Sequence, residues 1–310
     1  MIHIDEQFRQ VTEQLIRNSQ QEQLVDRDRV YQPANLKNRE LVEQIIAKLV
    51  LPGSRIEGYE NLLELYRRAR NGKSCIMLLE HYSNFDIPCL FYLAKQYDEG
   101  QEVTDAIVAM AGAKLNEESR FVLAFTEAYT RIVIFPARTL AALEGTPEYT
   151  EARTRSRIIN RSALREMVRL KHSGHIILLF PAGTRYRPGR PNTKTPLLET
   201  DSYIKGFDYL VTVGIAGNTL QVNKSGDMEK DQPGADVMVY NVGPVTDASE
   251  FRAKARANAP EGGDEAKRAV TTALQMEFEQ RHARAEEIRG KVVQELEKEG
   301  IRPTSIDISL

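Results

Sequence analysis

Long apolar segments are missing from this chain. Of its 310 residues 41% are hydrophobic, but the longest apolar runs, 75–79 and 176–180, are only as long as strands. A helix that spans a membrane needs about 18 or more apolar residues in succession. The first thirty residues carry several acidic side chains and no apolar block, which fits neither a secretory signal nor a transit peptide. The sequence therefore predicts a globular, soluble protein of the cytoplasm.

Cysteine, metal-binding and nucleotide-binding patterns are also scarce. Cys75 and Cys89 have neither CxxC nor Cys/His spacing and are expected to be reduced core residues. His172 and His175 form HxxH, but Gly174 lies between them and would break a helix that aligned them as metal ligands. The motifs GxGxxG and GxxxxGKS/T are absent. We expect no disulfide, no metal and no bound cofactor.

Charge is nearly balanced overall but uneven along the chain. The 42 basic and 44 acidic residues give a formal charge of −2, which argues against nucleic-acid binding. Residues 151–171 nevertheless contain seven basic side chains and two carboxylates. Five arginines there recur every four residues along one helical stripe: Arg153, Arg157, Arg161, Arg165 and Arg169. The sequence leaves open whether this stripe is a solvated face or contacts an acidic acyl carrier protein, a CoA phosphate or a membrane surface.

Apolar periodicity predicts two regions. Spacings of three and four predict helices in residues 1–72, an N-terminal helical region. Residues 73–310 alternate short apolar runs with amphipathic stretches, which is typical of an α/β domain. Strands are expected at 75–80, 106–110, 131–135, 175–180, 210–215 and 236–242. The longest helices are expected at 147–172, capped by Thr146 with Pro147 in its first position, and at 264–299, with Gly290 as a weak point.

The segment from His81 to Asp86 carries the first candidate chemistry. It lies between an apolar strand and an apolar helix whose start is marked by Pro88. Five positions along a continuous helix rotate by about 500°, so the two side chains can meet only if His81 ends the strand and Asp86 opens the helix. A neutral imidazole held by a carboxylate can act as a general base. The simpler alternative is that Asp86 or Asn84 only caps the helix.

The second candidate is the loop 180–189, with the sequence Phe-Pro-Ala-Gly-Thr-Arg-Tyr-Arg-Pro-Gly. It follows another apolar strand and brings Arg185 and Arg187 to the carboxyl edge of the sheet, where α/β folds bind ligands. Guanidinium groups match phosphate oxygens bidentately. Taken alone, an Arg-Pro-Gly loop is also typical of a solvated turn.

Together, these two segments resemble the HxxxxD glycerolipid acyltransferases. Each motif follows a strand, and the two lie in the expected order about a hundred residues apart. Between them, residues 131–138 look like the family's second block, with Arg138 at the position of its phosphate-binding arginine. The run Gly183-Thr184-Arg185-Tyr186-Arg187-Pro188 is most similar to the soluble, plastid-type glycerol-3-phosphate acyltransferases. The resemblance covers residues 74 to about 250.

This resemblance implies a fold like that of glycerol-3-phosphate acyltransferase, a mixed sheet flanked by helices behind a smaller helical N-terminal region. It implies that His81, oriented by Asp86, deprotonates a hydroxyl of glycerol 3-phosphate. That hydroxyl would attack the thioester of acyl-CoA or acyl carrier protein and give lysophosphatidic acid. The residues that would bind the acceptor are Arg138, Gly183, Thr184, Arg185 and Arg187.

Two departures from the family pattern leave alternatives open. Ala182 stands where membrane-bound members usually have Glu, which counts more against a lysophosphatidate enzyme than against a glycerol-3-phosphate enzyme. The fourth apolar block, residues 209–215, lacks its usual proline. The alternatives are acylation of a lysophospholipid, a non-catalytic lipid or carrier-protein binder, and a covalent route through Ser83 or Cys89, for which no GxSxG motif is present. Peripheral contact with a membrane also stays open.

Overall fold

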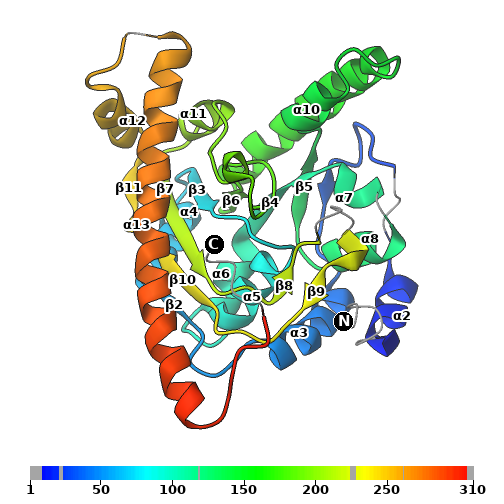
Figure 1. Cartoon of the computed structure of the whole chain (residues 1–310). Coiled ribbons are helices and arrows are strands. Elements are labelled where there is room, and N and C mark those ends of the chain that lie inside the picture. Colours follow the sequence, from blue (N-terminus) through cyan, green and yellow to red (C-terminus); the bar gives the residue numbers. More distant parts are fainter. Residues whose placement is uncertain (1–8, 21–23, 118, 224–227, 261, 306–310) are drawn as a thin grey trace.

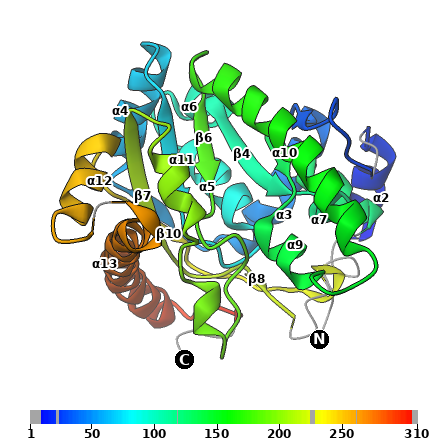
Figure 2. The same ribbon diagram turned by 90° about the horizontal axis from the view of Figure 1, so that it is seen from above.

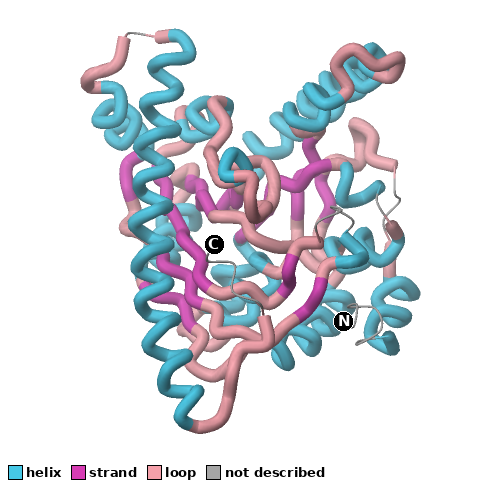
Figure 3. The backbone as a smooth tube through the Cα atoms, in the orientation of Figure 1, coloured by secondary structure: helices cyan, strands magenta, loops and turns pink. Residues whose placement is uncertain are grey.

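The computed structural model describes residues 9–20, 24–117, 119–223, 228–260 and 262–305, and a mixed sheet of nine strands forms its centre (Figures 1 and 3). Eight strands follow the order β1 (Tyr31–Gln32), β5 (Arg131–Ile134), β4 (Ile107–Gly112), β6 (Ile176–Leu179), β3 (Cys75–Leu79), β7 (Tyr209–Ala216), β10 (Val239–Val242) and β2 (Arg55–Glu57), and β11 (Thr246–Asp247) pairs with β7. The five strands from β5 to β7 are parallel, whereas β1 and β10 are antiparallel to β5 and β7. A separate ribbon pairs β8 (Leu220–Gln221) with β9 (Gln232–Pro233).

Helices cover both faces of this sheet (Figure 2), which confirms the predicted α/β class. All five residues of β3 are buried, and they alternate between a core on one face and a core on the other. The first core is covered by α2 (Arg9–Asn18), α3 (Leu36–Leu49), α4 (Tyr59–Arg70), α5 (Asp86–Ala94), α6 (Gly100–Ala106) and α8 (Arg120–Thr126). The second is covered by α10 (Tyr149–Lys171), α11 (Glu199–Ile204), α12 (Ala248–Arg256) and α13 (Gly263–Lys298). Burial on both sides explains the uninterrupted apolar sequence of the central strands.

All six predicted strands are present, as β3, β4, β5, β6, β7 and β10, but three details differ from expectation. The N-terminal region is not only helical, because it also supplies β1 and β2, which pair with β5 and β10 of the main sheet. Thr146 does not cap α10, which begins after Glu148 at Tyr149, so Pro147 precedes the helix. α13 runs without a break through Gly290, because Ile288 and Val292 on either side pack into a core with Ala216 of β7 and Val239 of β10.

The two longest helices of the described chain are α10 and α13. Within the described ranges, no helix is both long and apolar enough to cross a membrane. α10 has 23 residues and α13 has 36, but charged side chains recur along both.

Candidate active site

The imidazole of His81 and the carboxylate of Asp86 meet at the carboxyl end of β3. This strand ends at Leu79, α5 begins at Asp86, and His81 lies in the connection between them. Nδ1 of His81 is 2.8 Å from Oδ2 of Asp86. A carboxylate at this distance favours the tautomer with its proton on Nδ1, which leaves Nε2 as the basic nitrogen. The structure thus brings together the two side chains that the sequence pairs.

Asp86 also organises the backbone of the same connection. The amides of Tyr82 and Ser83 donate to its Oδ2 at 2.7 Å and 3.0 Å, and the Ser83 hydroxyl donates to its Oδ1 at 3.2 Å. The residue is only 1% exposed. The N-cap residue of α5 is Phe85, and among the described residues neither Asn84 nor Asp86 accepts from an amide of that helix, so the capping interpretation is wrong. The buried carboxylate of Asp86 instead holds both the imidazole and the amides of the loop before the helix.

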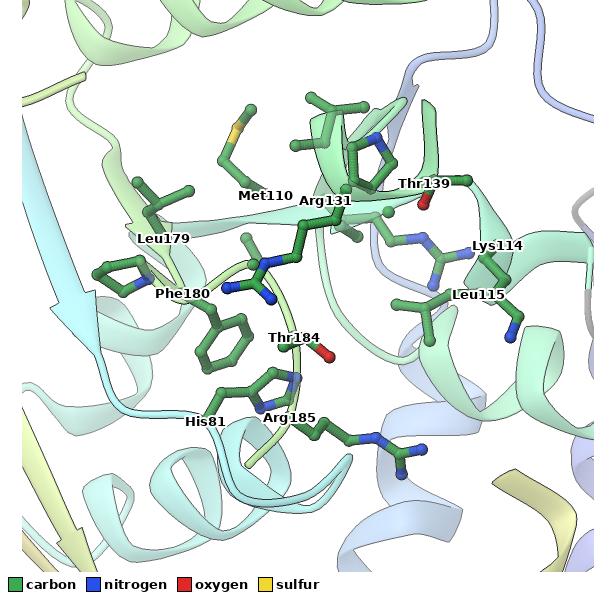
Figure 4. A pocket seen from close by; sticks show the side chains of 18 of the residues that line it. His81, Met110, Lys114, Leu115, Arg131, Thr139, Leu179, Phe180, Thr184 and Arg185 are labelled. Carbon is green, nitrogen blue, oxygen red and sulfur yellow. The ribbon is translucent and has the colours of Figure 1, made fainter. Parts of the chain in front are cut away.

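Phe180 and Tyr186 join the connection after β3 to the loop 180–189 after β6. The rings of His81 and Phe180 are stacked, with centroids 3.8 Å apart and an interplanar angle of 16°. The Tyr186 amide donates to the His81 carbonyl at 2.7 Å. Because β3 and β6 are adjacent parallel strands, the loops that follow them lie at one edge of the sheet. Figure 4 shows the His81 ring beside Phe180 and Thr184.

A cavity of about 700 Å³ opens next to the imidazole. The loops after β3, β4, β5 and β6 line it, together with the short helices α7 (Lys114–Glu117) and α9 (Ala137–Ala142). Its apolar walls belong to both cores, with Ile87, Ala109, Phe125 and Tyr129 among those on one face of the sheet and Met110, Ile134 and Leu179 on the other. Its volume falls within the range of about 300–1,000 Å³ typical of small-molecule sites.

The three arginines singled out from the sequence all line this cavity but differ in their partners. Arg185 is 7% exposed and forms an ion pair with Asp231, so its charge is already balanced. Figure 4 shows the Arg185 side chain extending away from His81. Arg138 donates from Nη2 to the Asn192 carbonyl at 3.2 Å, and its buried Nε has no hydrogen-bond partner among the described residues. Arg187 is half-buried, and its guanidinium forms no ion pair in the same part of the chain.

The loop backbone at Gly183 and Thr184 has defined but different roles. Gly183 has a φ of +63°, and a Cβ there would lie 2.8 Å from a Leu197 methyl carbon, so a side chain would be strained. Its amide donates to the Phe180 carbonyl at 2.9 Å and is not available to a ligand. The amides of Thr184 and Arg185 have no partner among the residues that the structure describes. They are among the backbone donors that this loop can offer to an oxyanion.

A polar network that the sequence does not reveal lies behind the His81 loop. The Tyr82 hydroxyl donates to Oε1 of Glu80 at 3.1 Å and lies 3.1 Å from Nδ1 of His282 on α13. That nitrogen is also 2.7 Å from the Ile215 carbonyl and 3.3 Å from Oε2 of Glu80. Burial opposes the charged imidazolium, but hydrogen bonding and attraction to Glu80 raise the pKa of His282. No local pattern joins Tyr82 to a residue 200 positions away.

Two side chains near His81, those of Ser83 and Cys89, are the candidate covalent nucleophiles. Ser83 is 2% exposed, and its hydroxyl donates to Asp86 instead of to the imidazole. Cys89 is free and fully buried, and burial raises the pKa of its thiol to about 12. A thiol of that pKa is protonated at neutral pH and is a poor nucleophile. Neither environment is that of an activated nucleophile.

Comparison with known proteins assigns no family to the chain. No protein-family model matches it, and no curated protein matches it. Its function must therefore be inferred from the site.

Proposed function

We propose that this chain is a glycerolipid O-acyltransferase with a fold like that of glycerol-3-phosphate acyltransferase. The observation that carries the proposal is the 2.8 Å contact of Asp86 with Nδ1 of His81, beside an apolar cavity bordered by arginines. Nε2 of His81 has no hydrogen-bond partner within the described ranges. A general base requires such a nitrogen, oriented by its other side and within reach of substrate.

The proposed reaction is a direct transfer. Nε2 of His81 takes the proton from a hydroxyl of glycerol 3-phosphate while the hydroxyl oxygen attacks the thioester carbonyl carbon. The tetrahedral intermediate then loses its C–S bond, and the imidazolium returns the proton to the thiolate, so that an ester and a free thiol form. Asp86 stabilises the imidazolium between these steps. The amides of Thr184 and Arg185 are the proposed donors to the oxyanion.

The lining of the cavity suggests how the two substrates divide it. Arg138 and Arg187 offer cationic donors for the acceptor phosphate, and a phosphate held there would fix which hydroxyl lies near His81. The apolar walls suit the acyl chain of the donor. Acyl-CoA and acyl carrier protein present the same thioester, so both are proposed as donors.

Substitution of His81 tests this proposal most directly. Purified wild-type protein and His81→Gln would be supplied with glycerol 3-phosphate and either donor, and thiol release and lipid product would be measured. A general base contributes about 10² to 10⁴ in rate, so we expect a loss in that range in His81→Gln with unchanged calorimetric binding of glycerol 3-phosphate. His175→Gln is the matched control, because His175 lies just before β6 and outside the cavity. A near-normal rate in His81→Gln would exclude the assigned base.

A lysophospholipid is the second candidate acceptor. The cavity has apolar walls on both faces of the sheet, which would accommodate the acyl chain of the donor and that of the acceptor separately. Comparing kcat/KM for glycerol 3-phosphate and 1-acylglycerol 3-phosphate decides between the two acceptors. If ligands bind but neither acceptor yields product, the chain is a non-catalytic lipid or carrier-protein binder.

A further inference from the structure

One exposed face of α10 is both basic and apolar. We define the α10 face as Arg153, Arg157, Ile158, Arg161, Leu164, Arg165 and Val168, all of which are exposed. Ile158 is 48% exposed, Leu164 55% and Val168 44%, and they are three of the six large hydrophobic residues recorded as exposed in the described ranges. This one helix thus gathers half of those residues.

Helical geometry places these side chains together. At about 100° per residue, the members of the α10 face fall within an arc of about 140°. Ile159, Ala163 and Met167 point to the opposite side and are buried against the sheet. Of the carboxylates on this helix, Glu166 forms an ion pair with Arg169 outside the face, and Glu151 lies in the first turn. The face itself therefore contains no carboxylate.

The arginines of the α10 face have no ion-pair partner in the part of the chain that the structure describes. Arg153, Arg157, Arg161 and Arg165 follow one another at i, i+4 spacing, where like charges repel and destabilise a helix. Nearby, exposed Leu164 and Val168 gain nothing from contact with water. A partner that supplies both negative charge and an apolar layer would offset both costs.

The α10 face adjoins the candidate active site. Asn160, on the neighbouring edge of the same helix, lines the cavity and exchanges hydrogen bonds with the backbone of Phe135. Figure 1 shows α10 projecting from the body of the protein on the side away from α13. A surface contacted by α10 would therefore lie beside the cavity.

We propose that the α10 face binds an anionic lipid surface. Its arginines would contact headgroup phosphates, and Ile158, Leu164 and Val168 would enter the boundary between headgroups and acyl chains. A lipid surface fits better than a folded acidic protein, because the apolar side chains alternate with arginines along about 15 Å of a projecting ridge. The proposal extends the proposed function, since an acylated product would enter the same surface, but lipid binding itself requires no acyl transfer.

The test is co-sedimentation of the full-length protein with vesicles. Vesicles of phosphatidylcholine with phosphatidylglycerol would be compared with vesicles of phosphatidylcholine alone. Each arginine near an anionic surface contributes about a fivefold gain in partitioning, so Arg157→Glu with Arg161→Glu should weaken binding at least about 25-fold. Leu164→Ser with Val168→Ser should also weaken it, through loss of apolar contact. The matched control is Arg268→Glu with Lys298→Glu, which makes the same charge change at exposed positions of α13.

The outcomes separate this proposal from the proposed function. We expect wild-type protein, the α13 control and His81→Gln to bind anionic vesicles equally, with binding weakened at high salt. The α10 variants should keep their circular dichroism and their turnover with water-soluble substrates. The proposal is wrong if wild-type protein does not bind anionic vesicles, or if the α13 control loses as much binding as the Arg157 and Arg161 variant. It is also wrong if the Leu164 and Val168 changes have no effect on binding. Salt-sensitive binding of an acidic carrier protein without vesicle binding would also overturn it.

Discussion

Replacing Asp86 by Asn removes one charge and little else. The Asn side-chain oxygen can occupy the position of Oδ2 and still accept from the His81 ring and from the amides of Tyr82 and Ser83. Its NH₂ group would then face the Ser83 hydroxyl, which can accept as well as donate. The two backbone amides therefore hold the amide in the orientation that preserves the His81 tautomer. What is lost is the negative charge that stabilises the imidazolium.

The expected size of this effect follows from the contact that changes. A hydrogen bond to a charged group contributes about 1.5–3 kcal/mol, which corresponds to a fall in kcat of about 10- to 100-fold. A larger fall, towards 10⁴-fold, would indicate that the Asn amide had flipped and imposed the wrong tautomer. The assay is thiol release from acyl-CoA at saturating glycerol 3-phosphate, with Ser83→Ala as the control that keeps both the carboxylate and its bond to His81. A kcat within threefold of wild type in Asp86→Asn would refute the proposed stabilisation of the imidazolium by the Asp86 charge.

Three further predictions concern the charged side chains around the site. Arg187→Gln should raise the acceptor KM about 10-fold or more while leaving the melting temperature unchanged, because its guanidinium forms no ion pair in the described ranges. Arg185→Met should lower the free energy of unfolding by about 3 kcal/mol in urea titrations, since it removes one partner of a buried pair with Asp231. The pKa of His282 is raised above its ordinary 6.5, so its stabilising contribution should be complete below pH 6.5 and vanish as pH rises through the folded-state pKa. Unfolding titrations of wild type and His282→Gln across that range should show the difference, and parallel profiles would contradict it.

The central strands could be predicted from the sequence because burial on both faces makes them uninterrupted apolar runs. Ile176–Leu179 and Cys75–Leu79 are the clearest examples, and both lie in the middle of the sheet. The edge strands β1 and β2 could not be predicted, because they have only two and three residues. Each has a single buried position, which is too little to form a recognisable apolar pattern. Their pairing depends on strands more than 90 positions away in the chain.

The contact between His81 and Asp86 could be predicted from the sequence because it is local. It joins residues five positions apart, and the strand-to-helix boundary between them leaves few geometries. The network of Glu80, Tyr82 and His282 joins the loop after β3 to the last helix, α13. Only the complete fold brings these residues together, so the network could not be predicted from the sequence. Local chemistry was therefore predictable, whereas the groups that support it from behind were not.

The two arginines of the 180–189 loop show how far a motif alone can carry an interpretation. Arg185 and Arg187 lie two positions apart in the same loop, and the sequence predicts that both bind phosphate. In the structure Arg185 points away from His81 and pairs with Asp231, which directly precedes β9, so it ties the loop to a segment 46 residues later. Separating the pair would leave a buried charge without its partner, which is costly. The pair therefore restricts where the loop can move. Phosphate binding in the proposed enzyme therefore falls chiefly to Arg187 and Arg138, with the Arg185 pair holding the loop that presents Arg187.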